Sequence, residues 1–171
     1  MGRIGPSVGG ARGRGLSCPD LGRGRQMATK DQRIIVGVDG SEASLDALRW
    51  AVSYARGVGG VVQAMRTWHY PWAMQTAPAQ TDANVEKQIQ GELDEAVTRA
   101  DVDTTGMTLE RVVKEGHASL VLVNESANAD LLVVGSKGRG AFAGMLLGSV
   151  SQHCANGAHC PVVIVRHEGH A

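Results

Sequence analysis

Residues 33–56, RIIVGVDGSEASLDALRWAVSYAR, join a short β-branched run to a longer amphipathic run. The run at 33–38 predicts a strand that is buried on both faces. Residues 39–56 predict a helix, because Ser41 can cap its start and apolar residues recur at helical spacing. These residues are Leu45, Leu48, Val52 and Ala55. A buried strand that leads directly into an amphipathic helix is typical of a parallel sheet covered by helices.

The same alternation of strand and helix continues along the rest of the chain. Further strands are predicted at 61–68, 107–116, 129–136 and 160–166, and further helices at 84–102, 117–128 and 149–158. We therefore expect a single-domain α/β sandwich of the Rossmann-like or flavodoxin-like kind, with a five-stranded parallel sheet in the order 3-2-1-4-5 and helices on both faces. Ligands of such sheets bind beyond the carboxyl ends of the strands where the strand order reverses, here between the first and fourth strands.

Composition divides the chain into a tail and one globular domain. Residues 1–28 are rich in glycine and arginine without apolar periodicity, so we expect a disordered tail, best explained as an upstream extension or a misassigned start. Residues 29–168 form the predicted domain, and 169–171 a flexible C-terminus. No apolar run is long enough to cross a membrane, and neither a membrane nor a nucleic acid is an expected partner.

Cysteine usage predicts a reducing, cytoplasmic location. Of the three cysteines, Cys18 lies in the tail, and no CxxC motif is present. Cys154 and Cys160 lie close to His153 and His159, but these residues lack the paired spacing of zinc sites. No metal site of the protein itself is therefore predicted.

A glycine-rich loop follows the predicted fourth strand. Its glycines are Gly135, Gly138, Gly140, Gly144 and Gly148. Because Ser149 then opens a helix, free backbone N–H groups could hold a phosphate there, with Lys137 and Arg139 adding positive charge. The loop could also be a plain connector. It is not a P-loop, its GxGxxxG spacing departs from the dinucleotide fingerprint, and Asp39 lacks the neighbouring acids of a phospho-accepting receiver.

The spacing Gly135-x2-Gly138-x9-Gly148-Ser149 matches the G-x2-G-x9-G-[ST] signature of ATP-binding universal stress proteins. Residues 33–166 resemble that family throughout, including IIVGVDGSEASLDALRWA near the start and GSVSQHCANGAHCPVVIVR near the end. The resemblance implies ATP, with Mg²⁺, across the ends of the first and fourth strands. It also implies a homodimer through the last strand, at 161–166.

Carried over residue by residue, the resemblance places Asp39 against the nucleoside and Thr67 beside adenine, while the glycine loop and the start of the following helix hold phosphate and ribose. The predicted nucleotide-binding residues are Val38, Asp39, Thr67, Val134, Gly135, Ser136, Gly138, Arg139, Gly148, Ser149, Val150 and Ser151. From its position alone, Asp39 could bond ribose hydroxyls, reach Mg²⁺, or only shape the turn into the helix.

The predicted function is a nucleotide-dependent stress-response regulator with slow or no ATP hydrolysis, acting on an unidentified protein partner. No general base and no paired carboxylates for two metals stand out in the sequence. Two alternatives remain: an adenine-nucleotide hydrolase or ATP-dependent transferase in which Asp39 binds Mg²⁺, and a dimerisation module that binds nothing. The loop at 69–83 could cover either the nucleotide or the sheet edge, and His117 is expected to face solvent near a helix cap.

Overall fold

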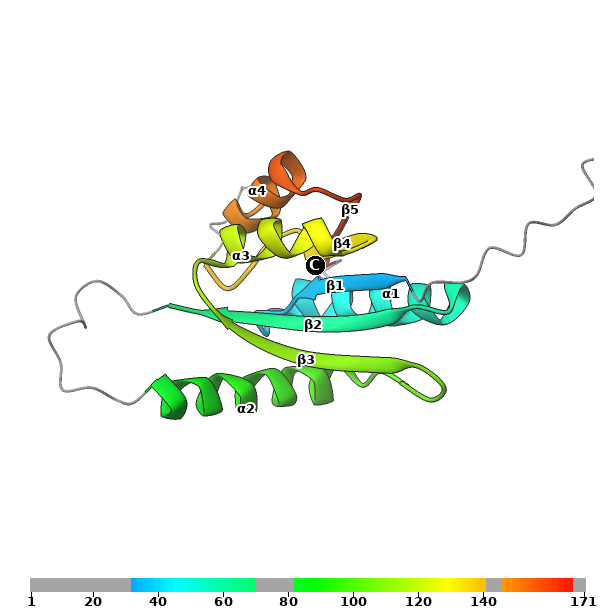
Figure 1. The fold of residues 1–171 in the computed structure, drawn as a ribbon, viewed down its shortest axis with the longest axis horizontal. Coiled ribbons are helices and arrows are strands. Elements are labelled where there is room, and N and C mark those ends of the chain that lie inside the picture. The colour runs from blue at the N-terminus through cyan, green and yellow to red at the C-terminus, as the bar shows by residue number, and fades with distance from the viewer. Residues whose placement is uncertain (1–31, 70–81, 141–145, 168–171) are drawn as a thin grey trace, which may run out of the picture.

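The computed structural model describes residues 32–69, 82–140 and 146–167 (Figure 1). Its strands are β1 Arg33–Gly37, β2 Val61–Trp68, β3 Thr108–Glu115, β4 Leu131–Gly135 and β5 Val162–Val165. Its helices are α1 Glu42–Val58, α2 Asp82–Ala100, α3 Ala118–Glu125, the 3₁₀ turn η2 Ser126–Asn128, and α4 Ser149–Gly157. The predicted tail, most of the loop at 69–83 and the C-terminal residues lie outside the described residues.

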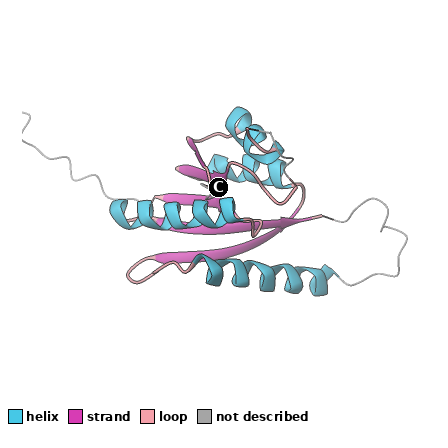
Figure 2. Cartoon of the chain, turned by 180° about the vertical axis from the view of Figure 1, so that it is seen from behind, coloured by secondary structure: helices cyan, strands magenta, loops and turns pink. Residues whose placement is uncertain are grey.

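The five strands form one parallel sheet in the order β3-β2-β1-β4-β5, which confirms the predicted topology. β1 lies at the centre, where Ile34 pairs with Val62 of β2 and Leu131 of β4. Because successive residues of a strand point to opposite faces, β1 supplies two separate cores. Ile34 and Val36 pack with α1 and α2, whereas Ile35 packs with α3 and α4. The helices thus cover both faces, as Figures 1 and 2 show.

The ends of the helices follow their capping residues. Ser41 caps α1 as predicted, and its Oγ accepts a hydrogen bond from the Ser44 N–H at 3.3 Å. Gly59 ends the same helix at φ 73°, a left-handed conformation that favours glycine. The helix predicted at 117–128 instead stops at Glu125 and tightens into η2. There the Ser126 hydroxyl donates to the Val123 carbonyl at 2.6 Å, which competes with the regular helical pattern.

Candidate functional site

Asp39 lies just beyond the end of β1 and connects two loops. Its Oδ1 accepts hydrogen bonds from the Ser41 N–H at 2.9 Å and from the Ser41 hydroxyl at 2.6 Å. Its Oδ2 accepts a bond from the Arg139 N–H, at 3.0 Å, in the glycine loop that follows β4. Burial works to raise the pKa of this carboxyl, but the hydrogen bonds from Ser41 and Arg139 outweigh burial and lower it. Asp39 therefore shapes the turn into α1 and also holds the glycine loop against β1.

Two glycines permit this close approach. A Cβ at Gly135 would lie 2.7 Å from the backbone carbon of Ala43, so the end of β4 can pack against the first turn of α1 only without a side chain. A Cβ at Gly138 would lie 2.5 Å from Asp39 Oδ2. The first and second glycines of the signature thus bring the loop onto α1 and onto the Asp39 carboxylate.

Ser136 anchors the start of α4. Its carbonyl accepts hydrogen bonds from the Gly148 N–H at 2.7 Å and from the Ser151 hydroxyl at 2.9 Å. The N–H groups in the first turn of a helix have no partner within the helix, and the positive end of the helix dipole lies there. The exposed Ser149 opens α4 and adds a hydroxyl to these donors.

A cavity of about 530 Å³ lies where β1 and β4 end, at the predicted reversal of strand order. All of the predicted binding residues line it except Ser136, which is buried and acts through its carbonyl. The cavity has further lining residues, most of them from β2, α3 and the loops: Gly37, Ser44, Met65, Arg66, His69, Lys137, Gly140, His117, Ala118 and Leu122. Because the lining residues come from so many separate segments, no single sequence motif could identify all of them.

His69 and His117 both line this cavity, and their rings contact each other. Their ring centroids are 4.9 Å apart with 27° between the planes, so the two imidazoles stack. His117 occupies the N-cap position of α3 and is exposed, as expected, but its side chain makes no capping hydrogen bond and contacts His69 instead. The expectation that His117 faces solvent near a helix cap is therefore confirmed, and the structure adds its ring contact with His69. Residues 70–81 of the loop that was expected to cover either the nucleotide or the sheet edge lie outside the described residues.

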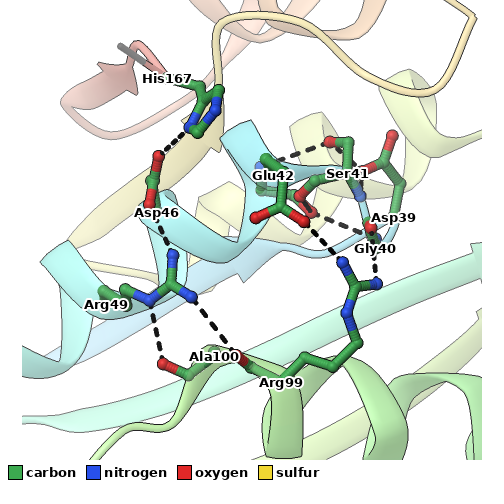
Figure 3. A network of polar contacts seen from close by, with 10 residues as sticks. Asp39, Gly40, Ser41, Glu42, Asp46, Arg49, Arg99, Ala100 and His167 are labelled. Atoms are coloured by element: carbon green, nitrogen blue, oxygen red, sulfur yellow. Dashed lines mark hydrogen bonds and ion pairs between the residues drawn. The ribbon is translucent and has the colours of Figure 1, made fainter. Parts of the chain in front are cut away.

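Positive side chains surround the turn from β1 into α1. Arg99 of α2 reaches across to this turn, where it donates to the Gly40 carbonyl at 3.3 Å and pairs with Glu42 at 2.6 Å (Figure 3). Arg66 of β2 is buried and forms an ion pair with Glu92 of α2. These contacts hold α2 against the same end of the sheet that carries the cavity.

The histidines and cysteines near α4 do not form a metal site. Within the described ranges, no three His, Cys, Asp or Glu side chains gather closely enough to hold an ion. Cys154 is fully buried, and burial raises its pKa to about 11. Cys154 is thus a core residue of the α4 side. Among the residues that were searched, no helix is both long and apolar enough to cross a membrane.

The sequence of this chain is similar to those of known proteins. The model of the universal stress protein family matches residues 31–166. Universal stress protein Rv2624c of Mycobacterium tuberculosis is 32% identical over 138 residues, which are 78% of this chain and 47% of that relative. The chain spans about half the length of the curated relatives that it matches.

Solved structures have the same fold. The structure of hypothetical protein MJ0577 aligns with 81% of this chain and 98% of its own at 16% identity and a TM-score of 0.68, a likeness of fold alone. The crystal structure of a universal stress protein in complex with cAMP aligns with 78% of this chain and 95% of its own. The identity there is 28% and the TM-score 0.53.

Proposed function

This chain belongs to the universal stress protein family, and we propose that it is a nucleotide-dependent regulator that binds ATP, with Mg²⁺, at the carboxyl ends of β1 and β4. The observation that carries the proposal is the glycine loop, which Asp39 draws onto the end of β1 beside the open first turn of α4. The 28% identical relative solved with cAMP supports an adenine nucleotide as the ligand class.

The chemistry of the lining fits such a nucleotide. A cavity of about 530 Å³ is in the range of small-molecule sites. A carboxylate has about four acceptor positions, and Ser41 and Arg139 use three of those on Asp39, which leaves at most one for a ribose hydroxyl. The first turn of α4 and the Ser149 hydroxyl would hold phosphate oxygens. Thr67 and the stacked rings of His69 and His117 would contact the base.

Mg²⁺ would enter mainly on the phosphate oxygens of the nucleotide. Asp39 is the single carboxylate among the residues that line the cavity in the described part of the chain. Mg²⁺ in such sites is held by one or two carboxylates together with substrate phosphates and waters. The last acceptor position of Asp39 can bind either the ribose hydroxyl or Mg²⁺, so with the ribose bound there, phosphate oxygens and waters would hold the ion.

Slow or no hydrolysis follows from the state of Asp39. A general base needs a free lone pair and a pKa near the working pH. The hydrogen bonds to Asp39 occupy most of its lone pairs and lower its pKa, so it is a weak base toward water. Rapid turnover that is lost in Asp39→Ala, with the fold intact, would instead favour the hydrolase or transferase alternative.

The proposed assembly is a homodimer through β5, acting in the cytoplasm on an unidentified protein partner. β5 is an edge strand, and its four apolar residues are only half-buried. On the neighbouring α1, Trp50, Tyr54 and Val58 are partly exposed, and the first two rings stack at 5.3 Å. They are spaced four residues apart, beginning from Asp46, and therefore lie with Asp46 on one face of α1. Asp46 contacts His167, just beyond β5, so this face of the helix borders the edge strand. The apolar residues of α1 and of β5 thus form one continuous apolar surface, which a second copy of the chain could cover in a dimer.

The test is titration calorimetry of the full chain with Mg²⁺ and ATP, together with an assay for released phosphate. We expect micromolar binding with little phosphate release. The double variant Gly138→Val and Gly148→Val should lose binding, because side chains there would fill the space beside Asp39 and the first turn of α4. The control is Gly91→Val, since Gly91 lies on an exposed part of α2 with nothing within 4 Å of an added Cβ. Unchanged affinity in the double variant would refute the site, and absence of binding to the wild-type chain would refute the function.

A further inference from the structure

Two guanidinium groups approach Gly40 in the turn between β1 and α1. A Cβ placed on Gly40 would lie 3.1 Å from Nη2 of Arg139 and 3.5 Å from Nη1 of Arg66. Both nitrogens are thus within 3.5 Å of one point, although one arginine comes from β2 and the other from the loop after β4. Both residues also line the cavity. Two positive groups therefore lie beside Gly40, the residue that follows Asp39, and both border the cavity.

Acidic side chains form ion pairs with two of the three arginines near this turn, whereas the Asp39 carboxylate bonds Arg139 only at its backbone N–H. Glu92 pairs with Arg66, and Glu42 pairs with the neighbouring Arg99. The guanidinium of Arg139, by contrast, has no hydrogen bond or ion pair with any described residue. Within the described part of the chain, Arg139 is bonded only through its backbone N–H, which donates to Asp39. Like charges held close together repel, and a shared anion removes that repulsion. A guanidinium fork matches the oxygens of a phosphate group in particular.

Asp39, the two arginines and the first turn of α4 border one cavity. Gly40, which lies beside both guanidinium groups, directly follows Asp39 in the chain. A Cβ on Gly148, at the start of α4, would lie 3.6 Å from the nitrogen of Gly138, which approaches the Asp39 carboxylate. A ligand whose sugar binds Asp39 therefore has two anion-binding groups along the same cavity. This step depends on the proposed function, which places a ribose at Asp39.

We infer that the site prefers nucleotides with a second phosphate on the ribose, with the 5′-phosphate at α4 and the 2′- or 3′-phosphate between Arg66 and Arg139. Elsewhere, an acidic residue binds a free ribose hydroxyl and an arginine accommodates a ribose phosphate. This cavity presents both kinds of residue side by side. Because a ribose has two hydroxyls, Asp39 can bind the free one while the arginines hold the phosphorylated oxygen.

The test compares affinities of the full chain for AMP, adenosine 2′,5′-bisphosphate and adenosine 3′,5′-bisphosphate at 0.15 M ionic strength, where distant charges are largely screened. We expect one bisphosphate to bind about tenfold more tightly than AMP, or better, as one charge-assisted hydrogen bond predicts. The two bisphosphates distinguish which ribose oxygen carries the phosphate. Arg139→Gln should reduce that ratio to about one, and Arg139→Lys should restore only part of it, because lysine lacks the fork.

Arg111→Gln is the matched control. It removes the same charge from an exposed residue of β3 that does not line the cavity, so the ratio should stay at the wild-type value. AMP binding without any preference for a bisphosphate would overturn this inference and leave the proposed function intact. A preference that persists in Arg139→Gln would overturn the arginine assignment. Failure of the wild-type chain to bind any adenine nucleotide, including ATP, would overturn both proposals.

Discussion

Exchange of Asp39 for asparagine tests how the site is held together. The amide has nearly the same shape as the carboxylate but only one acceptor oxygen. If that oxygen takes the Oδ1 position, it keeps both bonds from Ser41, and the NH₂ group then faces the Arg139 N–H. Two donors cannot bond each other. The variant should therefore keep the turn into α1 and release the glycine loop.

The expected loss of stability follows from that bond count. One hydrogen bond to a charged group disappears, and two others become bonds to a neutral oxygen. A hydrogen bond to a charged group contributes about 1.5–3 kcal/mol, so we expect the free energy of unfolding to fall by about 2–3 kcal/mol at pH 7. For a domain of this size, that corresponds to a decrease in Tm of roughly 5–10 °C.

The loss should also depend on pH. The pKa of Asp39 is lower in the folded chain than its usual value of 3.8, so the unfolded chain holds this proton more tightly. The stabilisation from Asp39 is therefore fully present above pH 3.8 and is lost as the pH falls through the folded-state pKa. The free energies of unfolding of the wild type and of Asp39→Asn should differ most near neutral pH and converge in acid. Because both proteins share the titration of all other carboxylates, subtracting one free energy from the other leaves the contribution of Asp39.

Urea unfolding followed by circular dichroism between pH 3 and pH 7 measures this difference, and amide hydrogen exchange of Arg139 reports on the loop directly. Asp94→Asn, at an exposed carboxylate of α2, is the control and should change stability by only a few tenths of a kcal/mol. A stability difference that does not vary with pH, or an Arg139 amide that stays protected in Asp39→Asn, would refute the reasoning.

Two further predictions concern packing. Gly135→Ala should lower the free energy of unfolding by about 2–3 kcal/mol in urea denaturation, because its Cβ would meet the backbone of Ala43 at 2.7 Å. The same exchange at Gly91, where nothing lies within 4 Å, should raise it by about 0.5–1 kcal/mol, and equal effects would contradict the packing argument. Cys154, buried and with a pKa raised to about 11, should resist thiol reagents at pH 8, and half-buried Cys160 should react before it, as mass spectrometry of labelled peptides would show.

Much of the fold was predictable because its signals are local. Apolar residues recur every second position in a strand and about every 3.6 positions in a helix, so both patterns can be recognised from neighbouring residues. The right-handed connection between parallel strands then restricts the order of the strands in the sheet. The cap of α1 at Ser41 was equally local. The third helix ended earlier than predicted because Ser126 makes hydrogen bonds to Val123 and to His159, and the second of these partners lies on the far side of α4 in the chain.

The sequence by itself determined the family, the topology and most of the glycine-loop side of the cavity, because glycine spacing and a strand-end aspartate are features of contiguous sequence. Only the tertiary structure decided which other residues line the cavity. It brought Arg66 and Arg139 to Gly40, and His69 to His117, across the ends of separate elements. Such pairs have no fixed spacing along the chain, since they meet only when β2, α3 and the loop after β4 reach the same edge of the sheet.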